Sequence, residues 1–209
     1  MADFWNRSWS TIDSARIEDY VDKMNMSPDY IIEFLKENYF QTVCDAGCGC
    51  GAYSLKLARN GLRVFGFDVS PTAVEIAKRV LSSSEYTDVD FKTASIISTG
   101  YPDNTFDAVI SRDVIDHIPF AIGIAAIKEL YRITKPNGKI IFTLDALDEE
   151  YEHEPHRVNL DGDYEFTGGK WEGMAFHPYT SDELGRLVQV GTFRQVSLED
   201  GGLLVIVAK

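Results

Sequence analysis

Apolar residues follow two alternating periods through the first two thirds of the chain, which predicts strands and helices in turn. The apolar run at 42–47 indicates a buried strand, and residues 52–59 indicate the helix that follows it. A second strand is expected at 63–68. The Ser-Pro pair that opens 70–81 combines a helix N-cap with proline at the first helical position. Such repeated strand–helix units are typical of a parallel sheet.

The later elements follow from the same patterns. Helices are expected at 121–133 and 180–190, and the second opens with the capping-box spacing of Thr and Glu. Further strands are expected at 90–94, 106–111, 139–146, 193–199 and 203–209. The last two strands are joined by Asp-Gly-Gly, a hairpin signal. We therefore predict an α/β fold, a doubly wound and mostly parallel sheet of seven strands that ends in an antiparallel hairpin.

Two segments lie outside this alternation. Residues 1–26 contain two tryptophans and are expected to form a helical arm or lid, and Ser-Pro-Asp at 27–29 predicts the start of the next helix. The segment 148–179 is rich in aromatic residues, glycine and histidine, which favours an irregular or β-hairpin insertion. A single domain over 1–209 is expected, divided into the arm 1–26, a core 27–147, the insertion 148–179 and a closing helix and hairpin 180–209.

Charge narrows the possible partners. The formal net charge is -13, whereas nucleic-acid affinity depends on clustered Lys and Arg that neutralise phosphates. No basic stripe stands out, so we expect neither nucleic acid nor a membrane as partner. No apolar run approaches the roughly 20 residues of a membrane span, and the N-terminus lacks a signal-peptide pattern. These features favour a cytoplasmic protein.

Three cysteines lie close together, at Cys44, Cys48 and Cys50, and the rest of the chain has none. Their spacing does not suit a disulfide scaffold. Zinc and iron–sulfur sites use wider, paired spacing and a fourth ligand. We therefore expect the cysteines to be small residues in a tight turn, without a metal ion. We expect no metal site at His153 and His156 either.

The stretch "VCDAGCGCG" at 43–51 places glycines between the first strand and its helix, where doubly wound sheets bind ligands. Gly47 and Gly49 allow a sharp turn and the close approach of a ligand. The pattern also fits a dinucleotide fingerprint, which leaves an NAD-linked oxidoreductase open. However, Asp45 before the glycines disfavours a pyrophosphate and favours a ligand that carries an ammonium or sulfonium. Asp68, at the end of the second strand, is placed to accept hydrogen bonds from ribose hydroxyls.

The chain resembles the class I S-adenosylmethionine-dependent methyltransferases, especially small-molecule methyltransferases of the type 11 and type 25 kinds. The likeness covers roughly residues 40 to 145, with blocks in the family's order: "VCDAGCGCG", "GFDVSPTAVEIAKR", "YPDNTFDAVIS", "DVIDHI" and "YRITKPNGKIIF". Such blocks in register are more specific than one glycine pattern. The resemblance implies a Rossmann-like fold and S-adenosyl-L-methionine as cofactor, with S-adenosyl-L-homocysteine as product.

The resemblance also implies roles for individual residues. The backbone of Gly47, Cys48 and Gly49 is expected beside the methionine part of the cofactor, with Asp45 near its polar groups. Asp68 is expected on the ribose. Val69, Ser95 and Ile96 are expected around the adenine, and Arg112 near the methionine. Ser95 departs from the family, which often has Asp there, and a hydroxyl lacks charge assistance. Asn137 replaces a common Gly, and Asn tolerates the same left-handed turn.

Several of these residues also have a purely structural interpretation. Asp45 fits a helix cap, Asp68 a strand-end acid without a ligand, and Ser95 an ordinary loop residue. His117 matches a family position at which packing is more plausible than catalysis. The expected acceptor pocket lies between the arm and the insertion. Its candidate residues are Trp5, Trp9, Tyr20, His117, His153, His156, Trp171, His177 and Tyr179. The insertion's aromatic residues equally fit a small core of their own.

The sequence thus predicts an S-adenosylmethionine-dependent methyltransferase that moves a methyl group to an O, N or C atom of a small-molecule acceptor. Because the sulfonium is already activated, the protein mainly has to align the reactants, and no catalytic residue stands out. Besides the NAD-linked oxidoreductase, a catalytically silent cofactor-binding protein stays open. A monomer or homodimer is expected.

Overall fold

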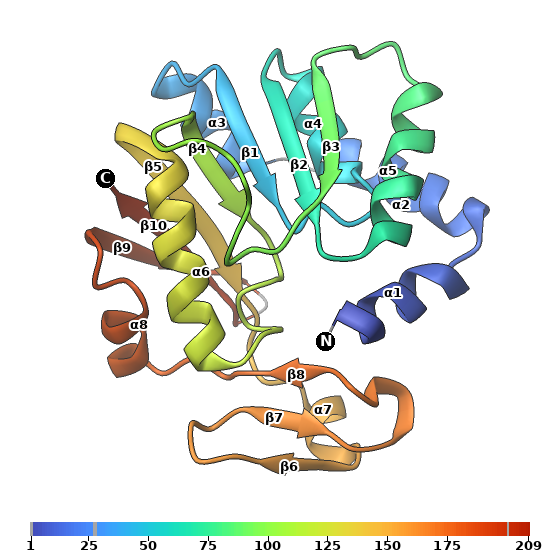
Figure 1. Cartoon of the computed structure of the whole chain (residues 1–209), viewed down its shortest axis with the longest axis vertical. Helices are drawn as coiled ribbons and strands as arrows, with labels where there is room; N and C mark the ends of the chain where they lie inside the picture. The colour runs from blue at the N-terminus through green and yellow to red at the C-terminus, as the bar shows by residue number, and fades with distance from the viewer. Residues whose placement is uncertain (1, 27–28, 200) are drawn as a thin grey trace.

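The computed structural model describes residues 2–26, 29–199 and 201–209. Within these residues, a seven-stranded sheet has the order β3-β2-β1-β4-β5-β10-β9 (Figure 1). Its strands are β1 (Thr42–Ala46), β2 (Arg63–Asp68), β3 (Val89–Thr93), β4 (Phe106–Ser111), β5 (Thr134–Leu144), β9 (Thr192–Ser197) and β10 (Leu203–Ala208). β1 to β5 are parallel, and β10 pairs antiparallel with both β5 and β9. The predicted doubly wound sheet with a closing antiparallel pair is confirmed.

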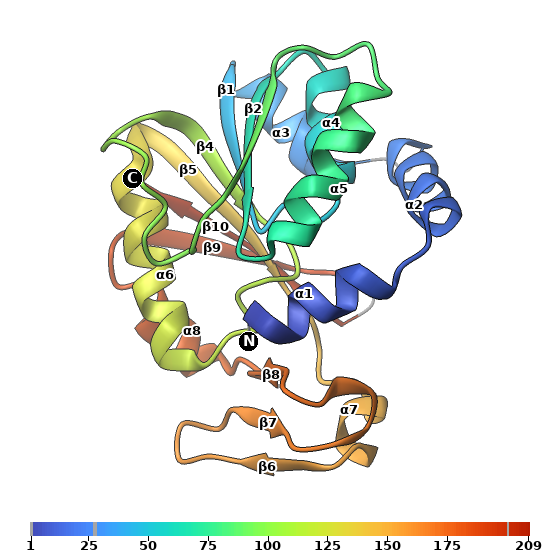
Figure 2. The same cartoon turned by 45° about the vertical axis from the view of Figure 1, so that its right-hand side comes forward.

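Helices cover both faces of this sheet (Figure 2). They are α3 (Tyr30–Glu37), α4 (Ala52–Arg59), α5 (Pro71–Ser82), α6 (Phe120–Ile133) and α8 (Ser181–Leu187). Two further helices, α1 (Ala2–Thr11) and α2 (Ser14–Met26), contact α5 and α4 respectively. Buried side chains of α3, α4 and α5 form one apolar core with the sheet, and those of α6 and α8 form the second on the opposite face. α5 buries one apolar stripe (Ala73, Val74, Ile76 and Ala77), as the sequence period requires, whereas α4 is buried on all sides over residues 52–58.

Local signals account for most helix ends. Ser70 caps α5 by accepting a hydrogen bond from the backbone N–H of Ala73 at 3.1 Å, with Pro71 at the first position. Thr180 and Glu183 form the predicted capping box of α8. The predicted start of α3 at Ser27-Pro28 lies outside the described residues, and Asp29 caps that helix instead.

β5 begins five residues earlier than the sequence predicts, at Thr134 instead of Lys139. Thr134 already pairs with Phe106, and the register then shifts before Ala108 pairs with Lys139. The predicted turn "KPNG" therefore lies within the strand as an irregularity. Asn137 has a φ of 68°, the left-handed conformation expected at this position.

The insertion is more regular than the sequence suggests. It contains α7 (Glu149–His153), β6 (His156–Val158), β7 (Tyr164–Phe166), the 3₁₀ turn η1 (Gly169–Trp171) and β8 (Ala175–Phe176). The three strands form a small antiparallel sheet, which Figure 1 shows below α1 and the main sheet. Its aromatic residues pack with Phe4 of α1 into an apolar core that is separate from the two cores of the main sheet. A small core in the insertion is one of the two interpretations that its composition allows.

The N-terminal region is helical, as predicted. Ile17 of α2 packs with Cys50, Ala52 and Ile76. Asn6 of α1 fixes the helix to the start of α5, because its side-chain oxygen accepts hydrogen bonds from the Ser70 hydroxyl and the Thr72 N–H. None of the helices in the described part of the chain is long and apolar enough to span a membrane.

Candidate cofactor and acceptor site

A cavity of about 510 Å³ lies at the carboxyl ends of the central strands. β1 lies between β2 and β4 in the sheet, which is the point at which the strand order reverses and doubly wound sheets bind ligands. The cavity is lined by all nine residues that the sequence assigns to the cofactor: Asp45, Gly47, Cys48, Gly49, Asp68, Val69, Ser95, Ile96 and Arg112. The fold thus brings together residues from four separate segments of the chain.

Asp68 is held by the backbone of two loops. One carboxylate oxygen accepts the N–H of Gly49 at 3.0 Å, and the other accepts the N–H of Ser70 at 2.8 Å. The side chain is 8% exposed. Burial raises its pKa, although these backbone N–H groups oppose that shift. Each oxygen keeps a further lone pair, so the carboxylate is oriented and still able to accept hydrogen bonds from a ligand.

Asp45 lies deeper, below the glycine turn. The Ser54 hydroxyl donates a hydrogen bond to its carboxylate at 2.6 Å. Burial raises the pKa of Asp45 to about 6, while this bond and the charge of Arg112 act in the opposite direction. Asp45 does not cap α4, because Gly51 occupies the N-cap position with a φ of 79°. The carboxylate is therefore buried for a reason other than helix capping.

The glycine turn is closely covered by the N-terminal helix. A Cβ at Gly49 would lie 2.7 Å from Cζ2 of Trp9, so any larger residue there would collide with the indole. Gly49 also has a φ of 52°, in the left-handed region that favours glycine. The close approach of Trp9 closes one side of the cavity with an aromatic wall.

Arg112 is fixed at the end of β4. Its guanidinium lies over the Tyr53 ring, 4.5 Å from the centroid, and one N–H donates to Sδ of Met24 at 3.3 Å. The adenine-side candidates are more open: Val69 is 39% exposed and the neighbouring Ile97 is 43% exposed. Tyr53 and Ile97 line the cavity but were not predicted from the sequence. Tyr53 is the second residue of α4, directly after the glycine turn, and this position is the only sign in the sequence that it lies near the cavity.

Comparison with known proteins agrees with this geometry. Residues 44–142 match the family model described as a methyltransferase domain. Residues 44–142, slightly less than half of the chain, thus form a methyltransferase domain. A SAM-dependent methyltransferase structure from Methanosarcina mazei has a TM-score of 0.68 at 22% identity, over 88% of this chain and 99% of that one. At this identity the likeness establishes the fold.

Two curated relatives of the methyltransferase domain act on different acceptor atoms. Phosphoethanolamine N-methyltransferase 3 of Arabidopsis thaliana is 32% identical over 127 residues, which are 60% of this chain and 23% of the relative. A ubiquinone biosynthesis O-methyltransferase of Methylocella silvestris is 36% identical over 76 residues, 36% of this chain and 29% of the relative. The chain thus spans less than a third of the length of either relative.

The predicted acceptor residues divide into two groups. Trp9, Tyr20 and His117 line the cavity, together with Trp5. The cavity is not lined by the other candidates, which are His153, His156, Trp171, His177 and Tyr179. Composition cannot separate these groups, because aromatic residues and histidine are used in small cores as well as in pockets.

The residues outside the cavity have structural partners. His177 is buried, and its Nδ1 lies 2.8 Å from a carboxylate oxygen of Asp163. The Tyr179 hydroxyl donates to the carbonyl of Ile115 at 3.3 Å. Trp171 packs in the core of the insertion. These contacts hold Trp171, His177 and Tyr179 at positions outside the cavity lining.

His117 lies in the cavity wall, between aromatic neighbours. Its ring is edge-on to Trp5 at 5.5 Å and tilted against Phe176 at 5.6 Å, measured between ring centroids. Burial lowers the pKa of His117, against the opposing effect of Asp145 and Asp113. The imidazole is therefore held neutral at physiological pH, in the form that accepts a proton or binds a metal ion.

Proposed function

We propose that the chain binds S-adenosyl-L-methionine in this cavity and uses it to methylate a small-molecule acceptor at an O, N or C atom. The observation that supports it most is the pairing of Asp45 and Asp68, two buried carboxylates on either side of a glycine turn in one cavity. A ligand with a ribose at one end and an ammonium and sulfonium at the other complements both acids. A dinucleotide pyrophosphate would place its negative charge against Asp45.

Each lining residue has a role in this proposal. Asp68 accepts hydrogen bonds from the ribose hydroxyls, while Val69, Ser95 and Ile96 surround the adenine. The Gly47–Gly49 turn, with Cys48 between the glycines, lies against the methionine portion. Asp45 and Arg112 face the polar ends of that portion. The turn has room only for glycine at two positions, because a Cβ on Gly47 would overlap Val114 and one on Gly49 would overlap Trp9.

The cofactor supplies an electrophilic methyl group on sulfur; the acceptor atom forms a bond to carbon as the carbon–sulfur bond breaks. The sulfur keeps the electron pair of the broken carbon–sulfur bond. An acceptor atom that carried a proton releases that proton. The protein contributes mainly by aligning acceptor, methyl group and sulfur, and such alignment is worth about 7–11 kcal/mol. A general base adds about 10²–10⁴-fold where the acceptor must be deprotonated.

The acceptor side is built by Trp5, Trp9, Tyr20 and His117. A wall of aromatic rings with one neutral imidazole suits an aromatic or apolar acceptor with an ionisable oxygen or nitrogen. The relatives include an N-methyltransferase of phosphoethanolamine and an O-methyltransferase of ubiquinone biosynthesis. An acceptor panel should therefore contain small amines and phenols.

Isothermal titration with S-adenosylmethionine, S-adenosylhomocysteine and NAD tests the cofactor. We expect binding of the first two at micromolar Kd and none of NAD; NAD binding alone would favour an oxidoreductase. Turnover to S-adenosylhomocysteine with the panel tests the transfer, and tight cofactor binding without turnover on a broad panel would favour a silent binding protein. Light scattering tests whether the chain is a monomer or a homodimer, as we propose. Microscopy of a tagged chain tests whether it is located in the cytoplasm.

A further inference from the structure

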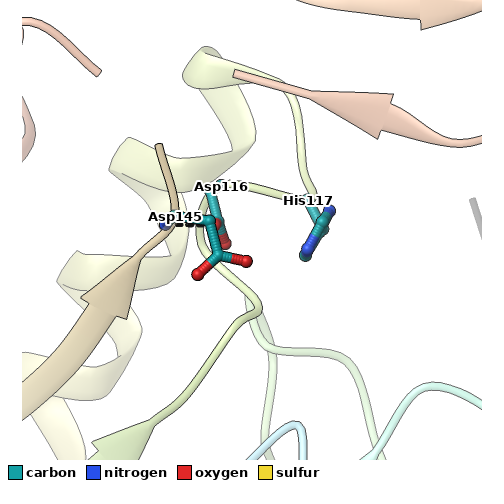
Figure 3. A group of neighbouring side chains, drawn as sticks. All are labelled: Asp116, His117 and Asp145. Atoms are coloured by element: carbon teal, nitrogen blue, oxygen red, sulfur yellow. Dashed lines mark hydrogen bonds between the residues drawn. The ribbon is translucent and has the colours of Figure 1, made fainter. Parts of the chain in front are cut away.

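Beside the cavity, three potential metal ligands meet at the ends of two neighbouring strands. Asp116 and His117 belong to the loop after β4, and Asp145 directly follows β5. One ligand atom from each of the three lies within 4.8 Å of the other two. Figure 3 shows the carboxylates of Asp116 and Asp145 side by side, with the His117 ring opposite them.

Two of these side chains carry buried polar atoms without a partner. Oδ1 of Asp116 and Nδ1 of His117 have no hydrogen-bond partner among the described residues. Asp116 is fully buried, and His117 is 7% exposed. Buried polar atoms are normally paired, because an unpaired one loses its hydrogen bonds to water without replacing them. Two unpaired atoms in neighbouring residues of one cluster therefore indicate a ligand that satisfies both.

The surroundings hold the cluster in place. The second oxygen of Asp116 accepts the backbone N–H of Asp145 at 2.7 Å, which ties the loop after β4 to the end of β5. The carbonyl of Asp116 accepts the N–H of His177 at 2.7 Å, so the insertion braces the same loop. Trp5 and Phe176 pack against the His117 ring. Ligands fixed in this way bind a metal at little cost in ordering.

The local charge also favours a cation. Asp113 lies next to this cluster, and its carboxylate and that of Asp145 are the charged groups that act on His117. The carboxylate of Asp113 is oriented by a hydrogen bond from the Thr143 hydroxyl at 2.7 Å. Negative charge thus gathers beside the His117 ring, next to the cavity that His117 helps to line.

We propose that Asp116, His117 and Asp145 form a binding site for one divalent transition-metal ion, of the Mn²⁺ or Zn²⁺ type. Carboxylate oxygens suit Mn²⁺ and imidazole suits Zn²⁺, so a mixed set of two oxygens and one nitrogen accommodates either ion. Three protein ligands leave positions for water or for a ligand oxygen. Since His117 also lines the cavity, an ion here stands at the wall where the acceptor is expected. The proposal does not depend on methyl transfer.

Titration of tag-free, EDTA-treated full chain with Mn²⁺, followed by the EPR signal of free Mn²⁺, tests the site directly. We expect one equivalent to bind and an equal amount of Zn²⁺ to displace it, because Zn²⁺ binds such ligands more tightly. Loss of a residue that only hydrogen-bonds to a metal ligand weakens metal binding roughly tenfold or more, so loss of a ligand itself should weaken Mn²⁺ binding at least as much. Asp145→Asn and His117→Gln should both show this loss.

Asp161→Asn is the matched control, since it removes an exposed acid of the insertion and should leave Mn²⁺ binding unchanged. Asp145→Asn is the decisive variant, because its exposed side chain can be changed with little risk to the fold; a thermal melt of the metal-free variants checks this. Absence of Mn²⁺ and Zn²⁺ binding by the unaltered chain would overturn the proposal and leave two carboxyl groups that share a proton. Binding that survives both substitutions would overturn it as well.

Discussion

The carboxylate of Asp68 accepts a hydrogen bond from the backbone N–H of Gly49 at 3.0 Å. This bond links the end of β2 to the glycine turn after β1, so the acid and the turn form one unit. Ser70 donates a second backbone N–H to the same carboxylate, at 2.8 Å. The side chain is therefore oriented before any ligand arrives, which lowers the cost of binding.

Asp68→Asn keeps the shape of the side chain but removes its charge and replaces one acceptor oxygen by a donor. We expect affinity for S-adenosylhomocysteine, measured by isothermal titration, to fall by about 10- to 100-fold, because a hydrogen bond to a charged group is worth about 1.5–3 kcal/mol. Asp88→Asn, at an exposed position before β3, serves as control and should bind normally. An unchanged Kd in a folded Asp68→Asn protein would remove Asp68 from the proposed site.

The pKa of about 6 for Asp45 predicts a pH dependence of ligand binding. Above pH 6 the carboxylate is ionised and attracts the ammonium of S-adenosylhomocysteine; below it the carboxyl is neutral, so affinity should decrease as pH falls from 7 to 5. Asp45→Asn should bind more weakly at pH 7 and show a smaller change over this range. Isothermal titration at each pH measures this. If the affinity of the unaltered chain and that of Asp45→Asn changed equally with pH, Asp45 would not have this role.

The stability of the ligand-free protein should respond in the opposite direction. Burial raises the pKa of Asp45 from 3.8 to about 6, so the folded state holds the proton more tightly than the unfolded state. The stability contributed by Asp45 is then full below the unfolded value and is lost as pH rises through 6. Urea unfolding at pH 5 and pH 7 should show that Asp45→Asn gains in stability relative to the unaltered chain as pH rises.

The nine residues predicted for the cofactor lie in short local blocks of sequence, and the fold brings them to one cavity. Asp68 ends a strand and Gly49 lies in a turn, and each position is fixed by nearby sequence. The acceptor side depends on tertiary packing instead. Nothing near His177 in the sequence shows that it is hydrogen-bonded to Asp163 rather than facing the cavity. Asp145 approaches Asp116 only because β4 and β5 are neighbours in the sheet.

Glu129, on α6, is expected to stabilise the face of the sheet that α6 and α8 cover. Its carboxylate accepts hydrogen bonds from Arg132 at 2.7 Å and from the hydroxyl of Thr99 at 2.6 Å, and these contacts lower its pKa to about 2. Glu129→Gln should reduce the free energy of unfolding at pH 7 by about 1–3 kcal/mol, since Arg132 is partly exposed and solvent weakens the pair.

The pH profile separates this ion pair from a simple packing defect. A lowered pKa gives stability that is complete above the unfolded value of about 4.5 and is lost as pH falls toward 2. The difference between Glu129→Gln and the unaltered chain in urea unfolding should therefore shrink over that window. Glu75→Gln, on the exposed face of α5, should behave like the unaltered chain. A difference that stays constant down to pH 2 would contradict the assignment.

The contact between Gly49 and Trp9 predicts that α1 must lie over the turn for ligands to bind. In Gly49→Ala the new methyl group would lie 2.7 Å from the indole, and the φ of 52° adds strain of about 1–2 kcal/mol. Gly61→Ala is the matched control, because Gly61 has a φ of 85° but nothing within 4 Å of the added carbon. We expect Gly49→Ala to weaken S-adenosylhomocysteine binding at least tenfold and Gly61→Ala to leave it unchanged.

A second substitution separates the collision from the backbone strain. Trp9→Ala removes the indole, so the Gly49→Ala change should cost less affinity in that background than in the unaltered chain. The double-mutant cycle should give a coupling energy of about 0.5–3 kcal/mol, as found for residues in contact. Isothermal titration of the four proteins measures it, with limited proteolysis to report whether α1 has moved. If the two changes were simply additive, α1 would not lie close over the turn in solution, and the cavity would lack its aromatic wall.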